Sequence, residues 1–123
     1  MQSLRQGYRA LIVGASGGIG TALVAALRDD PACGAVETLS RATAPQVALT
    51  DEASVEAART RPQAVIAALH PGTVATSLSE AYGAGHARIS PGQSAQMLLE
   101  VLDRLQPDQT GGFFAYDGSP IEW

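Results

Sequence analysis

The chain has 123 residues, a usual size for one domain with its own core, and we predict a single domain over residues 1–123. Its hydrophobic content of 46% predicts a folded chain. The formal net charge is -4, all eight basic residues are Arg, and no basic cluster occurs, which argues against a nucleic-acid partner.

Cysteine content and hydropathy predict the compartment. The single Cys33 excludes an intrachain disulfide and is typical of a reducing environment. No run approaches the about 20 apolar residues that span a bilayer. The apolar run at residues 10–13 is too short for a signal peptide. We therefore predict a cytoplasmic protein without a membrane segment.

Strand and helix patterns alternate from the start of the chain. Tyr8–Val13 is a short apolar run followed by glycine, as in a buried parallel strand. Residues 18–30 continue as an amphipathic helix, which ends before Pro31. Residues 35–39 predict a second strand, and residues 46–49 a third, weaker one.

The same alternation continues to the end. Residues 51–59 predict a short helix and residues 63–69 a fourth strand, after which residues 71–89 form a long loop. Ser90 then begins a capping box for a helix over residues 91–106, and residues 111–118 predict the last strand. The pattern indicates an α/β fold: a small doubly wound, Rossmann-like parallel sheet of about five strands in the order 3-2-1-4-5.

A glycine-rich loop follows the first strand. Gly14 ends the strand, while Gly18 and Gly20 open the helix. Residues without Cβ let a dinucleotide pyrophosphate approach the backbone, and a helix N-terminus offers free N–H groups and a favourable dipole. A tight turn without a ligand is the alternative. The strand–glycine–helix context favours the nucleotide site.

The end of the second strand suggests which dinucleotide is bound. Ser40 and Arg41 stand where the adenosine ribose lies in such folds, and an Arg there accommodates a 2′-phosphate. The alternative is a solvated loop arginine. Given a nucleotide site, we predict NADP as the cofactor, with NAD less favoured.

Four motifs in order resemble the short-chain dehydrogenase/reductase family, in its C-factor-like branch. They are "VGASGGIG", "LTD" at residues 49–51, "HPGTVATSLS", and the C-terminal segment that begins at "SAQMLLEVLDRLQ". The resemblance covers nearly the whole chain and implies a nicotinamide cofactor. It places the pyrophosphate side on the glycine loop, the 2′-phosphate after the second strand, and the nicotinamide along the Pro-Gly segment. The implied cofactor-binding residues are Gly14, Ser16, Gly17, Gly18, Ile19, Gly20, Ser40, Arg41, Leu49, Pro71, Gly72, Val74 and Thr76.

The chain also departs from the family pattern. Val13 replaces the usual Thr, and Ala48 replaces an Asp that usually contacts the adenine. Gly14, Gly17 and Gly20 also fit the Gly-x-x-Gly-x-x-Gly spacing of related subfamilies, which leaves the subtype open.

The resemblance implies an internal deletion between the helix at residues 51–59 and the strand at residues 63–69. The family's Asn-Ala-Gly strand, its Ser-bearing strand and its Tyr-x-x-x-Lys helix have no counterpart, and the chain contains no Lys at all. Tyr82 and His86, with Ser77 nearby, are weak substitutes for the catalytic residues; ordinary loop residues are the alternative. No metal-ligand spacing is present.

Loss of that segment would leave one face of the sheet short of helices, which predicts a homo-oligomer, most simply a dimer. Two functions stay open at this point. One is an NADP(H)-binding domain without efficient catalysis. The other is a small NADPH-dependent carbonyl reductase with a non-standard or oligomer-completed active site, acting on a small carbonyl substrate.

Overall fold

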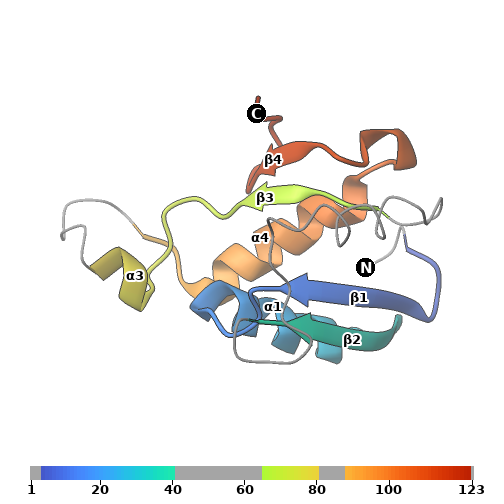
Figure 1. Ribbon diagram of the computed structural model, residues 1–123, viewed down its shortest axis with the longest axis horizontal. Coiled ribbons are helices and arrows are strands. Elements are labelled where there is room, and N and C mark those ends of the chain that lie inside the picture. The colour runs from blue at the N-terminus through green and yellow to red at the C-terminus, as the bar shows by residue number, and fades with distance from the viewer. Residues whose placement is uncertain (1–3, 41–64, 81–87, 123) are drawn as a thin grey trace.

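The computed structural model describes residues 4–40, 65–80 and 88–122. These residues form a mixed α/β arrangement in which the four strands point in the same direction (Figure 1). The elements in chain order are β1 (Tyr8–Val13), α1 (Gly18–Asp29), β2 (Cys33–Leu39), β3 (Ala68–His70), α3 (Ser77–Glu80), α4 (Pro91–Arg104), a 3-10 turn (Pro107–Gln109) and β4 (Phe113–Ala115).

The strands pair as two separate parallel sheets. β1 pairs with β2, in a register that joins Val13 to Leu39, and β3 pairs with β4, in a register that joins His70 to Ala115. The expectation of one sheet of about five strands in the order 3-2-1-4-5 is therefore wrong. The first and second strands pair as expected, as β1 and β2, and the expected fourth and fifth strands pair as β3 and β4. However, β1 and β3 do not pair with each other. The expected third strand (residues 46–49) and the helix at residues 51–59 lie outside the described residues.

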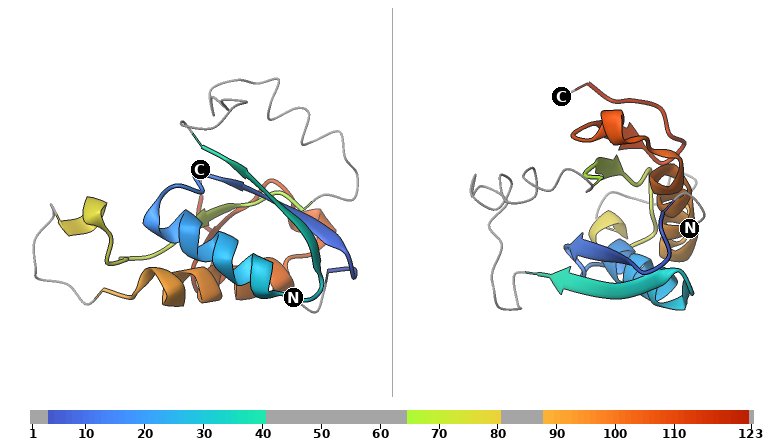
Figure 2. Two further views of the ribbon diagram at one scale, coloured as in Figure 1. Left: turned by 90° about the horizontal axis from the view of Figure 1, so that it is seen from below. Right: turned by 90° about the vertical axis from the view of Figure 1, so that its right-hand side faces the viewer.

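The two strand pairs share one helix layer. α1 and α4 pack directly on each other and lie on the same side of the strands (Figure 2). The two strand pairs are therefore held together through the helix layer, without a shared ladder between β1 and β3.

The described core lies where α1 and α4 meet the strands. Its buried apolar side chains come chiefly from α4, with contributions from α1, β4 and the segment after β3: Val24, Leu27, Val74, Ala95, Leu98, Leu99, Val101, Leu105 and Phe114. The start of β1 is also tied to the end of α1, because Tyr8 Oη donates to Asp30 Oδ2 at 2.8 Å. Burial, reinforced by this hydrogen bond, raises the pKa of Tyr8, so the phenol stays protonated.

The start of α4 is set by the predicted capping box. The Ser90 side chain accepts from the Gln93 N–H at 3.1 Å, and the Ser90 N–H donates to Gln93 Oε1 at 2.9 Å. Other boundaries differ from expectation. β2 begins two residues earlier, at Cys33; β3 and β4 are shorter than predicted; and the loop at residues 71–89 contains the unpredicted helix α3.

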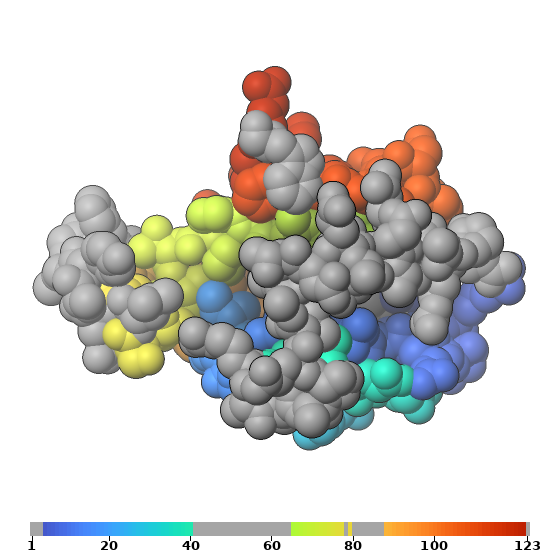
Figure 3. Space-filling model, in the orientation of Figure 1, coloured from blue at the N-terminus to red at the C-terminus, as the bar shows by residue number. Residues whose placement is uncertain are grey.

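One face of the β1–β2 sheet is turned away from the helices. Along β1 exposure alternates, so that Leu11 is 54% exposed and Val13 47%, while Ala10 and Ile12 are half-buried. Arg9 and Glu37 form an ion pair between the two strands. Figure 3 views the molecule from the strand side, where parts of β1 and β2 reach the surface. Two large apolar side chains of β1 therefore contact solvent. No described helix is both long and apolar enough to cross a membrane.

Candidate nucleotide site

The loop between β1 and α1 has the geometry of an anion-binding turn. Gly14 adopts φ +83°, and the Gly17 N–H donates to the Gly14 carbonyl at 3.1 Å. Gly17 then takes the N-cap position of α1 without a side-chain capping bond. The first N–H groups of an α-helix have no intrahelical acceptor, and here no side chain at the N-cap position accepts from them. They are available to an anion.

The glycines in this loop serve different purposes. A Cβ added to Gly20 would lie 2.2 Å from the Gly14 carbonyl oxygen and 2.9 Å from Ala15 Cα, so only glycine permits this close approach of helix and loop. A Cβ added to Gly14 would have no atom within 4 Å. Gly20 therefore serves internal packing, while Gly14 faces open space from which a ligand can approach the backbone. Ile19, in the first turn of α1, is half-buried.

The Pro-Gly segment, residues 71–76, follows β3 and is fixed from two sides. Ser94 is fully buried on α4, and its Oγ donates to the Pro71 carbonyl at 3.1 Å. Val74 is buried and forms a bridge with Ile89. Gly72 has φ +73°, and a Cβ there would lie 2.8 Å from the Tyr116 ring. Both the backbone conformation and the contact require glycine at this position.

The glycine loop and the Pro-Gly segment meet. A methyl group added at Gly18 would lie 3.2 Å from Thr76 Cγ2, so these distant motifs are neighbours. They follow β1 and β3, whose carboxyl ends point to the same side of the molecule (Figure 1). In open α/β folds, ligands bind outside the carboxyl ends of the strands. The structure thus places two predicted parts of the site side by side where such ligands bind.

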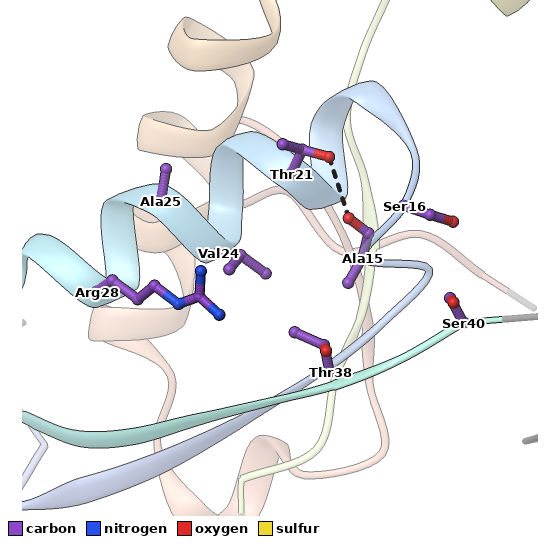
Figure 4. A pocket seen from close by; sticks show the side chains of 8 residues that line it. All are labelled: Ala15, Ser16, Thr21, Val24, Ala25, Arg28, Thr38 and Ser40. Carbon is purple, nitrogen blue, oxygen red and sulfur yellow. Dashed lines mark hydrogen bonds between the residues drawn. The ribbon is translucent and has the colours of Figure 1, made fainter. Parts of the chain in front are cut away.

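A pocket of about 390 Å³ adjoins the glycine loop, between α1 and the end of β2 (Figure 4). Ser16 and Ser40, both predicted from the sequence, line it on the side of the loop. Three further polar residues, Thr21, Arg28 and Thr38, were not predicted. A signal for them exists: positions 21, 24, 25 and 28 share one helix face, and positions 38 and 40 share one strand face. The described residues that line it are Ala15, Ser16, Thr21, Val24, Ala25, Arg28, Thr38 and Ser40.

The remaining predicted residues are distributed as follows. Ser77, a weak substitute for a catalytic residue, begins α3 and is exposed. Arg41, Leu49, Tyr82 and His86 lie outside the described residues. Among the residues that the structure describes, no group of three or more His, Cys, Asp or Glu side chains could hold a metal ion.

Comparison with known proteins gives partial matches to oxidoreductases. The chain is 32% identical over 111 residues to the 1-hydroxy-2-glutathionyl-2-methyl-3-butene dehydrogenase of Rhodococcus sp. (strain AD45), a match that covers 89% of this chain and 47% of that protein. It is 32% identical over 72 residues to an uncharacterised oxidoreductase of Schizosaccharomyces pombe, covering 48% of this chain and 28% of that protein. No protein-family model and no solved structure matches the chain significantly.

A third relative agrees with the branch indicated by the C-terminal motif. The chain is 34% identical over 64 residues to the C-signal protein of Myxococcus xanthus, covering 51% of this chain and 36% of that protein. The chain spans about half the length of the Rhodococcus dehydrogenase and less of the others. The glycine loop and the Pro-Gly segment meet beyond the strand ends, and these partial matches to oxidoreductases and to the C-signal protein bear out the resemblance of the chain to the short-chain dehydrogenase/reductase family.

Proposed function

We propose that this chain binds a nicotinamide dinucleotide, NADP(H) in preference to NAD(H), without efficient family-type catalysis. The observation that carries the proposal is the loop between β1 and α1. Its N-cap residue has no side-chain capping bond, and the space above Gly14 is open. Such a loop fits a pyrophosphate, because backbone N–H groups and the helix dipole favour the anion.

The residues that would hold the cofactor come from three segments. The glycine loop would bind the pyrophosphate, the end of β2 would bind the adenosine ribose, and the Pro-Gly segment would lie along the nicotinamide, with Thr76 near the phosphates. The preference for NADP(H) rests on Arg41, which stands two residues after the end of β2 in the sequence. When bound, the cofactor supplies the hydride.

A titration of the purified protein, followed by cofactor fluorescence, tests the proposal. Saturable binding is expected for both cofactors, tighter for NADPH than for NADH. Ser16→Asp is expected to lower the affinity for NADPH and for NADH by about tenfold, because it places a negative charge beside the phosphates. Gln96→Glu is the matched control, since it adds the same charge at an exposed position of α4. No saturable binding by the unmodified protein would overturn the proposal.

The missing catalysis is inferred from the sequence. The chain has no Lys and so cannot contain the family's Tyr-x-x-x-Lys pair. The names of two relatives, a dehydrogenase and an oxidoreductase, favour a second candidate: a small NADPH-dependent carbonyl reductase with a non-standard proton donor. NADPH consumption with a panel of aldehydes and ketones separates the two. Turnover that is lost in Tyr82→Phe or His86→Gln supports the reductase, and no turnover on any substrate supports binding alone.

We also propose that the chain forms a homodimer through the open face of β1. Leu11 and Val13 contact solvent on this face, and exposed apolar side chains on a parallel sheet are unfavourable in water. Sedimentation equilibrium at micromolar concentration is expected to give the dimer mass. A double Leu11→Ser, Val13→Ser variant is expected to shift the equilibrium towards monomer. An unmodified protein that sediments as a monomer would contradict the proposal.

A further inference from the structure

The pocket beside the glycine loop contains one cationic side chain whose function the proposed site does not yet include. Arg28 lies in the third turn of α1, and its guanidinium points into the pocket towards Thr38 (Figure 4). Within the part of the chain that the structure describes, it forms no ion pair. By contrast, Arg9 is paired with Glu37 and Arg104 with Glu100. Arg28 is therefore available for a ligand.

The rest of the described lining combines hydroxyl groups with apolar side chains. Four hydroxyl groups line the pocket, those of Ser16, Thr21, Thr38 and Ser40, beside Val24 and two alanines, and no described lining residue carries a carboxylate. Thr21 already donates its hydroxyl to the Ala15 carbonyl at 3.1 Å, which fixes the wall next to the loop. Hydroxyl donors together with a guanidinium are a usual set for a phosphate group, and a guanidinium stays charged at every physiological pH.

The strand register turns the acidic side chain of β2 away from this pocket. Thr38 and Ser40 lie on the side of β2 that faces α1, and Glu37 alternates to the opposite side, where Arg9 pairs with it. The Asp30 carboxylate at the end of α1 is turned towards Tyr8. Among the described residues that line the pocket, Arg28 is thus the one charged side chain, and it favours an anionic ligand.

The position of the pocket suggests which anion. It adjoins the glycine loop at Ser16 and the end of β2 at Ser40, the two places between which a dinucleotide's adenosine ribose would lie. Its volume of about 390 Å³ exceeds that of a single phosphate and lies within the range of small-ligand pockets. A phosphate monoester carried on a sugar therefore fits the site better than a bare ion.

We propose that this pocket receives the ribose 2′-phosphate of NADP(H) and that Arg28, on α1, is a specificity-determining residue that contacts it. This inference rests on the proposed cofactor binding. It adds a cation that no motif of the sequence indicated. It also makes the preference for NADP(H) depend on a helix side chain as well as on the segment after β2.

The test compares Arg28→Gln with the unmodified protein, using NADPH, NADH, adenosine 2′,5′-bisphosphate and 5′-AMP as ligands. Arg28→Gln is expected to lower the affinity for NADPH and for the bisphosphate by about tenfold, which is the effect of losing one charged hydrogen bond. The affinities for NADH and 5′-AMP should not change. Arg28→Lys should keep part of the preference. Arg104→Gln is the matched control, because it removes the same charge from an exposed position of α4 that does not line the pocket.

The outcomes separate the two proposals. If the unmodified protein binds neither dinucleotide, both are overturned. If it prefers NADPH and Arg28→Gln keeps that preference, only the assignment of Arg28 fails. An equal loss of affinity for NADPH and NADH in Arg28→Gln also overturns the assignment, since it would reflect a general effect on the site. If inorganic phosphate alone displaces the bisphosphate at equal concentration, the pocket binds free phosphate and the sugar-linked assignment is wrong.

Discussion

Gly20→Ala is expected to abolish saturable binding of NADPH and to lower the free energy of unfolding by about 3 kcal/mol or more. The added Cβ would lie 2.2 Å from the Gly14 carbonyl oxygen and 2.9 Å from Ala15 Cα. Both are backbone atoms, so no side chain can rotate away to relieve the clash. The loop must then move away from α1, which displaces the backbone that would hold the pyrophosphate. Urea denaturation and the fluorescence titration measure the two effects.

Gly92→Ala is the matched control. Gly92 also lies in the first turn of a helix, α4, but the nearest atom to its added Cβ is Ser90 Oγ at 4.0 Å. The same substitution there is expected to leave binding unchanged and to raise stability by up to about 1 kcal/mol, because Ala favours the helix. If Gly20→Ala binds NADPH like the unmodified protein, the loop in solution differs from the one described.

Among substitutions outside the candidate site, Phe114→Ala is expected to lower the free energy of unfolding the most. Phe114 is 7% exposed and packs with Val101 of α4 and with Leu105 at the C-cap of that helix, so its ring joins β4 to the helix layer. Truncating a buried Phe costs about 3–5 kcal/mol. Single domains are stable by only about 5–15 kcal/mol. The midpoint of urea unfolding should therefore fall steeply, and β4 should lose its support.

Phe114→Leu, which retains most of the apolar volume, is expected to cost less than about 1.5 kcal/mol. A large difference between the Ala and Leu variants is the mark of a packing effect. If Phe114→Ala unfolded at the same urea concentration as the unmodified protein, β4 would not be packed on α4 in solution.

Local features of this fold could be predicted from the sequence because they depend on neighbouring residues. The bounds of β1 and the Ser90 capping box of α4 are confirmed, since an apolar run ending in glycine and a Ser-Pro-x-Gln pattern specify them locally. The helix α3 was missed because a four-residue helix has no detectable period.

Long-range features were predicted less well. Strand patterns correctly gave the neighbours β1–β2 and β3–β4. They did not show that β1 and β3 stay unpaired, or that the two pairs meet through the packing of α1 on α4. The glycine loop and the Pro-Gly segment were recognised as motifs, and their contact at Gly18 and Thr76 needed the structure. Arg28 was missed because it matters only once α1 is placed beside β2.

The central claim is that the glycine loop holds a nicotinamide dinucleotide, and an NMR titration of ¹⁵N-labelled protein with NADPH tests it most directly. Saturable shifts are expected for the backbone amide signals of Gly14, Gly17, Gly18 and Gly20, with a smaller response at Thr76. Gly7 and Gly111 precede β1 and β4, at the opposite ends of the strands, and should not respond. Unchanged loop signals at saturating NADPH, or shifts confined to Gly7 and Gly111, would contradict the account.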